Sequence, residues 1–109
     1  MRDIDPNQAI DYILKNSEQF AQAKAERIYL EEFRKSKKAL LMQKHREESI
    51  GAQEREAYAH PEYKELLEGL REAIEREEKL RWDLVAAQAR VDVWRSLEAS
   101  NRREGRAVA

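Results

Sequence analysis

A heptad repeat in the second half of the chain constrains the fold more than any other feature. Between Leu66 and Trp94, mostly apolar residues recur at intervals that alternate between four and three residues. The positions are Leu66, Leu70, Ala73, Glu77, Leu80, Leu84, Ala87, Val91 and Trp94. This spacing is typical of a coiled-coil seam, and Glu77 is its polar interruption. The repeat predicts a long helix that buries one narrow stripe against other helices.

The composition leaves room for helices and little else. Of 109 residues, 39% are charged, and only three are Gly and two are Pro. Leu, Ile, Val and Phe together number 22, which is low for a chain that folds alone into a globule. Narrow apolar stripes bury little surface, so the free energy gained from burial does not clearly exceed the entropic cost of ordering the chain. We therefore expect an all-α fold: an elongated antiparallel helical hairpin with a short N-terminal helix, forming a coiled-coil-like oligomer.

Capping signals divide the chain into segments. Asp5-Pro6 and His60-Pro61 are each typical of a helix start, Asn16-Ser17 of a second cap or a kink, and Gly51 of a helix stop. In the first long helix, the expected apolar stripe is Phe20, Ala23, Ile28, Tyr29, Leu30, Phe33, Leu40 and Leu41. Within a single helical domain, 1–109, the predicted segments are a short helix at 6–15, a basic-ended long helix at 17–49, a partly helical connector at 50–60, the heptad helix at 61–103, and a frayed tail at 104–109.

The sequence carries no signal for secretion or for membrane insertion. It contains no cysteine, its start is acidic, and no apolar run approaches the ~18 residues that cross a bilayer. We expect a soluble cytoplasmic protein without a membrane partner.

Charge is strongly segregated along the chain. Residues 33–46 hold six basic and no acidic side chains, whereas residues 47–83 hold six basic and twelve acidic ones. The dipole of the first long helix accounts for Lys44 and Arg46 at its end, but not for Arg34 to Lys38, which repel one another. Two sources of negative charge could neutralise these cations. One is the phosphate backbone of nucleic acid, and the other is the acidic helix, through Glu68, Glu72, Glu75, Glu77 and Glu78.

A nucleic-acid site would combine these cations with an aromatic side chain on which bases stack. Tyr58 lies near Arg55 in the predicted connector, whereas Tyr29 and Phe33 are expected to pack in the helical seam. The candidate nucleic-acid-binding residues are Arg34, Lys35, Lys37, Lys38, Lys44, Arg46, Arg55 and Tyr58.

Catalytic signals are weak. Arg55 and His60 share the spacing of some small helical ribonucleases, but His60 precedes a proline at a helix start, where a capping role is expected. Neither histidine has a glutamate three residues before it, as a helical di-metal site requires. We therefore predict no enzyme, no catalytic residue, no metal and no cofactor.

Four segments resemble a known family. They are Lys35-Ser36-Lys37-Lys38-Ala39-Leu40, Arg55-Glu56-Ala57-Tyr58, Tyr63-Lys64-Glu65-Leu66-Leu67 and Leu80-Arg81-Trp82-Asp83-Leu84. Together they resemble the UvsY-type phage recombination mediators. The resemblance implies a homo-oligomer that binds single-stranded DNA and helps load a RecA-like recombinase by displacing single-strand-binding protein. It also implies a bacterial or phage-infected host cell.

The resemblance further assigns roles to residues. Lys35, Lys37, Lys38 and Arg55 would contact DNA, and the seam would form the oligomer core through Leu66, Leu70, Leu80, Leu84, Val91 and Trp94. The leading hypothesis is thus a non-enzymatic, oligomeric single-stranded DNA-binding accessory of recombination. The alternative is a coiled-coil assembly or adaptor protein with protein partners only.

Overall fold

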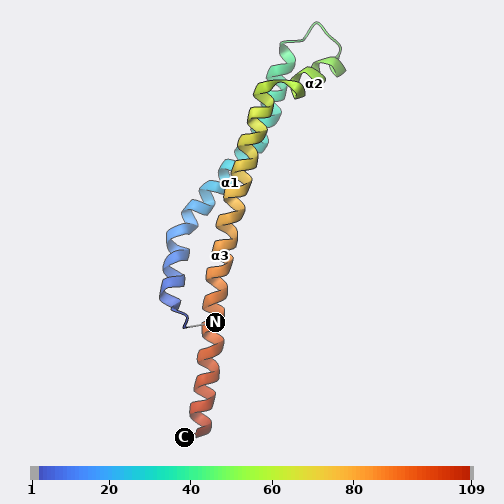
Figure 1. The fold of residues 1–109 in the computed structure, drawn as a ribbon. Helices are drawn as coiled ribbons and strands as arrows, with labels where there is room; N and C mark the ends of the chain where they lie inside the picture. Colours follow the sequence, from blue (N-terminus) through green and yellow to red (C-terminus); the bar gives the residue numbers. More distant parts are fainter. Residues whose placement is uncertain (1–2, 109) are drawn as a thin grey trace. The chain divides into compact units, whose positions relative to one another are not determined.

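The computed structural model describes residues 3–108, and the side chains of residues 3–106. It contains three α-helices, α1 (Pro6–Gln43), α2 (Ile50–Ala59) and α3 (Pro61–Val108), and no strand within the described residues (Figure 1). The expected all-α class is confirmed.

The chain forms two compact units, which we call unit 1 and unit 2. Unit 1 combines the chain up to Phe20 with α3 from Lys79 onward, and unit 2 comprises Ala21–Glu78. In unit 2, Arg27 pairs with Glu77 and Lys37 with Glu62, so that α1 and α3 run antiparallel. In unit 1, the segment from Ile13 to Phe20 likewise lies along the segment from Gln88 back to Arg81. The predicted helical hairpin is therefore present in both units.

Both predicted helix starts are confirmed by their caps. The Asp5 carboxylate accepts hydrogen bonds from the backbone amides of Asn7 and Gln8, at 2.9 and 3.3 Å. At the start of α3, the His60 Nδ1 atom accepts from the amide of Glu62 at 3.0 Å, and Pro61 takes the first helical position.

The predicted break at Asn16-Ser17 is wrong, because α1 is continuous from Pro6 to Gln43. The Asn16 side chain donates to the Tyr12 carbonyl at 2.9 Å, and the Ser17 hydroxyl donates to the Leu14 carbonyl at 3.4 Å. Both polar side chains therefore bond back to their own helix instead of capping a new one.

The first long helix ends at Gln43 and not at residue 49, and the connector at 50–60 forms a helix of its own. Ser49 causes the difference, since its hydroxyl accepts from the Ala52 amide at 3.3 Å and caps α2. Gly51 consequently lies in the first turn of α2 and is no helix stop. In the predicted tail at 104–109, α3 continues to Val108, and Ala109 lies outside the described residues.

The heptad residues of α3 lie on the face that packs against α1 of the same chain. In unit 1, Ala87 and Val91 form a buried cluster with Ala9, while in unit 2 Leu66 and Ala73 line the α1–α3 boundary. Of the seam residues assigned to an oligomer core, Leu70 and Val91 are buried and Leu66, Leu80, Leu84 and Trp94 are half-buried. A second copy would therefore meet other faces of the hairpin, and the oligomer itself stays a prediction.

The predicted stripe of α1 is confirmed in part. Phe20, Ala23, Leu30, Phe33 and Leu41 are buried or half-buried, whereas Ile28, Tyr29 and Leu40 are exposed. Ala9, Ile13, Asn16 and Arg27 are also buried or half-buried, so that the positions 9, 13, 16, 20, 23, 27 and 30 are spaced alternately by four and three residues. This heptad is not recognisable from apolar spacing in the sequence, because two of its positions are the polar residues Asn16 and Arg27.

Candidate nucleic-acid interface

The predicted basic residues lie on the end of α1, on the following turn and on α2, all in unit 2. Three of the lysines have carboxylate partners. Lys37 reaches Glu62 of α3 at 3.1 Å, Lys38 reaches Glu54 of α2 at 3.5 Å, and Lys35 reaches Glu32 on its own helix at 3.3 Å. The structure therefore neutralises part of the basic segment internally.

The partners differ from the acidic residues that the sequence suggested as counter-charges. Glu68 pairs with Arg71 at 3.0 Å, and Glu77 pairs with Arg27. Glu54 was missed because α2 was treated as a connector, although it returns the chain toward the end of α1, and Glu62 was missed because the acidic residues considered lie further along α3. The hydrogen bond to Lys37, and then the charges of Lys37 and Lys44, hold the pKa of Glu62 below its usual range.

Lys38 and Tyr58 form the centre of the site. The Lys38 Nζ atom lies 4.8 Å from the Tyr58 ring centroid, within the range of a cation–π contact. Hydrogen bonding to Tyr58 is the main cause that raises the pKa of Lys38, with Glu54 contributing. The Tyr58 ring meets Tyr63 edge-on, with 5.3 Å between ring centroids, yet 47% of Tyr58 stays exposed. An aromatic surface is thus held in place while still open to solvent.

Helix geometry brings two arginines beside this pair. Arg34 precedes Lys38 by one turn of α1, and Arg55 precedes Tyr58 by one turn of α2, so each lies on the same side of its helix as its neighbour. We call Arg34, Lys38, Arg55 and Tyr58 the basic–aromatic face. Two further cations, Lys44 and Arg46, lie on the turn between the two helices.

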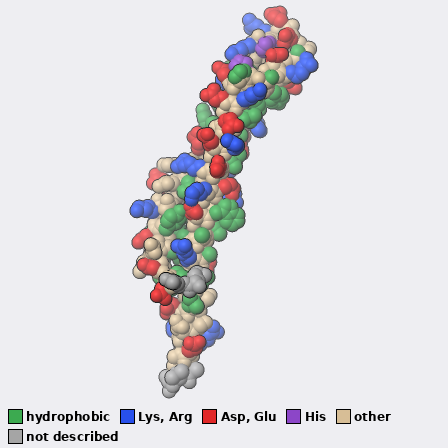
Figure 2. Space-filling model, in the orientation of Figure 1, with side chains coloured by type: hydrophobic (Ala, Val, Ile, Leu, Met, Phe, Trp, Pro, Cys, Tyr) green, Lys and Arg blue, Asp and Glu red, His purple; other side chains and the backbone are tan. Residues whose placement is uncertain are grey.

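Not every cation is neutralised. Among the side chains of residues 3–106, Arg34, Lys44, Arg46 and Arg55 form no ion pair and are exposed. Figure 2 shows basic and acidic side chains intermixed around the two histidines of this region. The surface is therefore a mixed one, with particular cations available to an anionic ligand.

The other aromatic pair lies only partly in the helical seam. Phe33 is half-buried beside Leu66, but Tyr29 is exposed and stacks on Phe33, with 5.8 Å between ring centroids. The expectation that Tyr29 packs in the seam is wrong, because its position on α1 points away from α3.

Sequence reasoning missed an ion cluster inside the hairpin of unit 2. The Arg27 guanidinium donates two hydrogen bonds to the Glu77 carboxylate and a third to Glu31 at 3.0 Å. These bonds raise the pKa of Arg27. Glu77, of which only 4% is exposed, interrupts the seam of α3 where Arg27 interrupts that of α1. The two polar interruptions therefore match each other, a role typical of residues that fix helix register.

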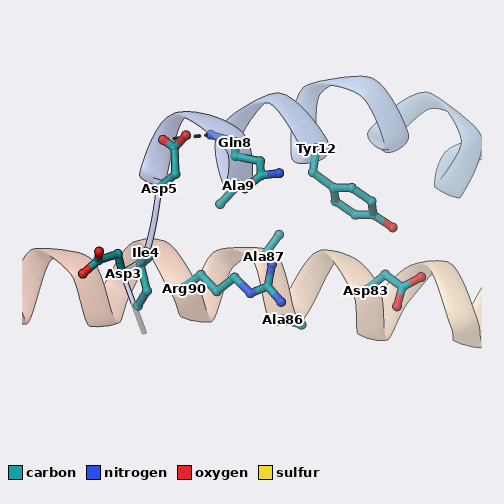
Figure 3. Close-up of a pocket in the computed structure, with 10 residues that line it drawn as sticks. All are labelled: Asp3, Ile4, Asp5, Gln8, Ala9, Tyr12, Asp83, Ala86, Ala87 and Arg90. Carbon is teal, nitrogen blue, oxygen red and sulfur yellow. Dashed lines mark hydrogen bonds between the residues drawn. The ribbon is translucent and has the colours of Figure 1, made fainter. Parts of the chain in front are cut away.

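A hollow of about 660 Å³ lies in unit 1, between the start of α1 and α3 (Figure 3). Three of its polar groups, those of Asp5, Asp83 and Tyr12, already serve the fold. Asp5 caps α1, and Asp83 accepts from Lys79 at 2.9 Å, which lowers the pKa of Asp83. Burial and Asp83 raise the pKa of Tyr12. No buried side-chain nitrogen or oxygen of the described residues lacks a hydrogen-bond partner, so nothing here points to a ligand.

His60 takes the capping role that the sequence predicted, through its bond to the Glu62 amide. Within residues 3–106, no group of three or more His, Asp or Glu side chains is placed to hold a metal ion. None of the described helices has an apolar stretch long enough to cross a bilayer.

Comparison with protein-family models, with curated proteins and with solved structures gives no significant match for this chain.

Proposed function

We propose that this chain is a non-enzymatic protein that binds single-stranded nucleic acid through the basic–aromatic face of unit 2. The observation that carries the proposal is the Lys38–Tyr58 contact, flanked by two arginines that form no ion pair within the described residues. Cations neutralise phosphates, and an exposed aromatic ring offers a base a stacking surface. Both groups are needed for a single strand, whose bases are unpaired.

The resemblance to UvsY-type mediators makes single-stranded DNA the expected ligand. In that case, the chain acts as an accessory of recombination, and its protein partners are a RecA-like recombinase or a single-strand-binding protein. The charge arrangement supports a weak, salt-sensitive interaction, because three of the lysines already have carboxylate partners.

The internal ion pairs favour a second candidate function. If Glu54 and Glu62 satisfy the basic segment, the hairpin serves as an assembly or adaptor module that binds proteins alone. The two functions differ in one property, which is the affinity for an oligonucleotide at low salt.

Fluorescence anisotropy of a labelled oligothymidine separates them. If Arg34, Lys44, Arg46 and Arg55 each neutralise one phosphate, the logarithm of the association constant should fall by about 3 per tenfold rise in salt. The Arg34→Ala/Arg55→Ala variant should bind at least tenfold more weakly. The matched control is Arg95→Ala/Arg102→Ala, which removes two arginines from unit 1 and should leave binding unchanged.

Tyr58 variants test the stacking role separately. Tyr58→Phe keeps the ring and should retain affinity, whereas Tyr58→Ala should weaken binding by roughly tenfold, the value of one stacked base. Absence of binding in low salt, or equal losses in the two arginine pairs, would remove the nucleic-acid proposal and leave the assembly role.

A further inference from the structure

An acidic side chain, that of Glu54, contacts the centre of the basic–aromatic face. Its carboxylate lies 3.5 Å from the Nζ atom of Lys38, and the same Nζ atom lies 4.8 Å from the centroid of the Tyr58 ring. Glu54 precedes Tyr58 by one turn of α2, so both project from the same side of that helix. A carboxylate is thus paired with the cation that touches the exposed ring.

Lys38 has a second partner besides Glu54. Hydrogen bonding to Tyr58 contributes more than Glu54 does to the raised pKa of Lys38. The Lys38 side chain is 28% exposed, whereas that of Glu54 is 45% exposed and the more open member of the pair. Loss of the carboxylate would therefore leave the ammonium group in place beside the ring.

The fold of unit 2 does not depend on this ion pair. The buried cluster of Leu41, Ala57 and Tyr63 already holds α2 against the end of α1. Glu54 also lies beyond the first turn of α2, where the helix dipole gives an acidic residue little advantage. Glu62, the partner of Lys37, differs in this respect, because it lies in the first turn of α3.

The cations of the face differ in their availability to a ligand. Arg34 and Arg55 form no ion pair among the side chains of residues 3–106, whereas Glu54 balances the charge of Lys38. A phosphate that approaches Lys38 competes with the carboxylate for the same ammonium group and is repelled by it. Because ion pairs at the surface are weak, this competition changes the affinity by a moderate factor.

We propose that Glu54 lowers the affinity of the basic–aromatic face for a single strand by withholding Lys38 from the phosphates. The inference rests on the proposed nucleic-acid function and concerns the regulation of the same site. In the native chain, the four cations without an ion pair neutralise phosphates, and Lys38 positions the Tyr58 ring. Removal of the Glu54 charge adds one phosphate contact beside the stacked base. The carboxylate thus keeps the strand bound loosely enough to be released.

Fluorescence anisotropy of a labelled oligothymidine in low salt tests the proposal. Glu54→Gln should bind roughly threefold to fivefold more tightly than the wild type, which is the effect of one exposed ion pair. The logarithm of its association constant should also fall more steeply with the logarithm of salt concentration, by about 0.7, the value for one more phosphate of a single strand.

The matched control is Glu56→Gln. Glu56 is exposed, forms no ion pair among the described side chains, and lies on the opposite side of α2 from Glu54. The substitution removes the same charge from the same helix, so it should change the affinity by less than about twofold and leave the salt dependence unchanged. Circular dichroism should give Glu54→Gln the melting temperature of the wild type to within about 5 °C.

A variant of Lys38 shows whether this lysine is the cation set free. Lys38→Ala/Glu54→Gln should have the salt dependence of Lys38→Ala alone, because no ammonium group is left to gain a phosphate. Equal gains in Glu54→Gln and Glu56→Gln, or an unchanged salt dependence in Glu54→Gln, would contradict the role of Glu54 while leaving strand binding intact. Absence of binding in both the wild type and Glu54→Gln removes the nucleic-acid function itself, whereas binding that appears only in Glu54→Gln supports both proposals.

Discussion

At the scale of single residues, the Arg27–Glu77 pair is the most consequential contact of unit 2. Glu77 is the buried charged residue of the described chain, and Arg27 supplies two of its hydrogen bonds. Removing one partner of a buried pair leaves a charge without compensation, whereas replacing both partners by apolar residues avoids that loss. The pair therefore specifies how α1 and α3 align in unit 2 more than it adds stability.

We expect Glu77→Ala to lower the melting temperature by roughly 10 °C, followed by circular dichroism. Glu31→Ala serves as the control, because Glu31 makes a single, more exposed contact with the same arginine. The double variant Arg27→Leu/Glu77→Leu should recover most of the loss. Equal effects of Glu31→Ala and Glu77→Ala would show that burial of Glu77 does not matter.

The lowered pKa of Glu62 predicts a dependence of stability on pH. A carboxylate whose pKa is lower in the folded state stabilises the fold above its unfolded value, here 4.5, and loses that contribution as the pH falls through the folded value. Asp83 acts in the same direction through Lys79. The free energy of unfolding in urea should therefore be flat above about pH 5 and fall below about pH 4.5.

Carboxyl titration by NMR identifies the cause. Lys37→Ala should raise the pKa of Glu62 toward 4.5, while Lys35→Ala, whose partner is Glu32, should leave it unchanged. An unchanged Glu62 pKa in Lys37→Ala would contradict the assigned ion pair.

At the scale of elements, Gly69 is a position in the interior of α3 where alanine should stabilise the helix. A Cβ atom added at this position meets no atom within 4 Å, and glycine in a helix interior is about 1 kcal/mol less favourable than alanine. Gly69→Ala should raise the melting temperature by roughly 5 °C. Gly105→Ala, near the end of the same helix, should change it much less. A destabilised Gly69→Ala variant would mean that this position is closely approached by another chain.

The starts of α1 and α3 were predictable from the sequence, while the continuity of α1 through Asn16-Ser17 and the start of α2 after Ser49 were not. Asp5 and His60 precede prolines, and that local pattern is sufficient to position a start. Asn16 and Ser17 carry the same capping chemistry, but nothing local shows that their side chains bond back to α1. Ser49 was overlooked because Gly51 looked like a stronger signal, although no described glycine has a positive φ.

At the scale of the whole chain, segregation of charge in the sequence located the basic segment but did not identify its acidic partners. The six cations of residues 33–46 are evident in the sequence, whereas the contacts of Lys37 and Lys38 depend on how α2 returns. The heptad of α3 likewise predicted a buried face. It did not show that the facing stripe of α1 includes the polar residues Asn16 and Arg27. The hydrogen bonds that allow these side chains to lie there are visible only in the folded structure.

The distribution of aromatic residues gives the chain a built-in optical reporter. Both tryptophans, Trp82 and Trp94, belong to unit 1, and the basic–aromatic face of unit 2 offers tyrosine alone. An indole that leaves water emits at shorter wavelength. Unfolding of unit 1 should therefore shift the emission to the red as the half-buried Trp94 enters water, whereas an oligonucleotide seated on Tyr58 should leave the emission maximum in place.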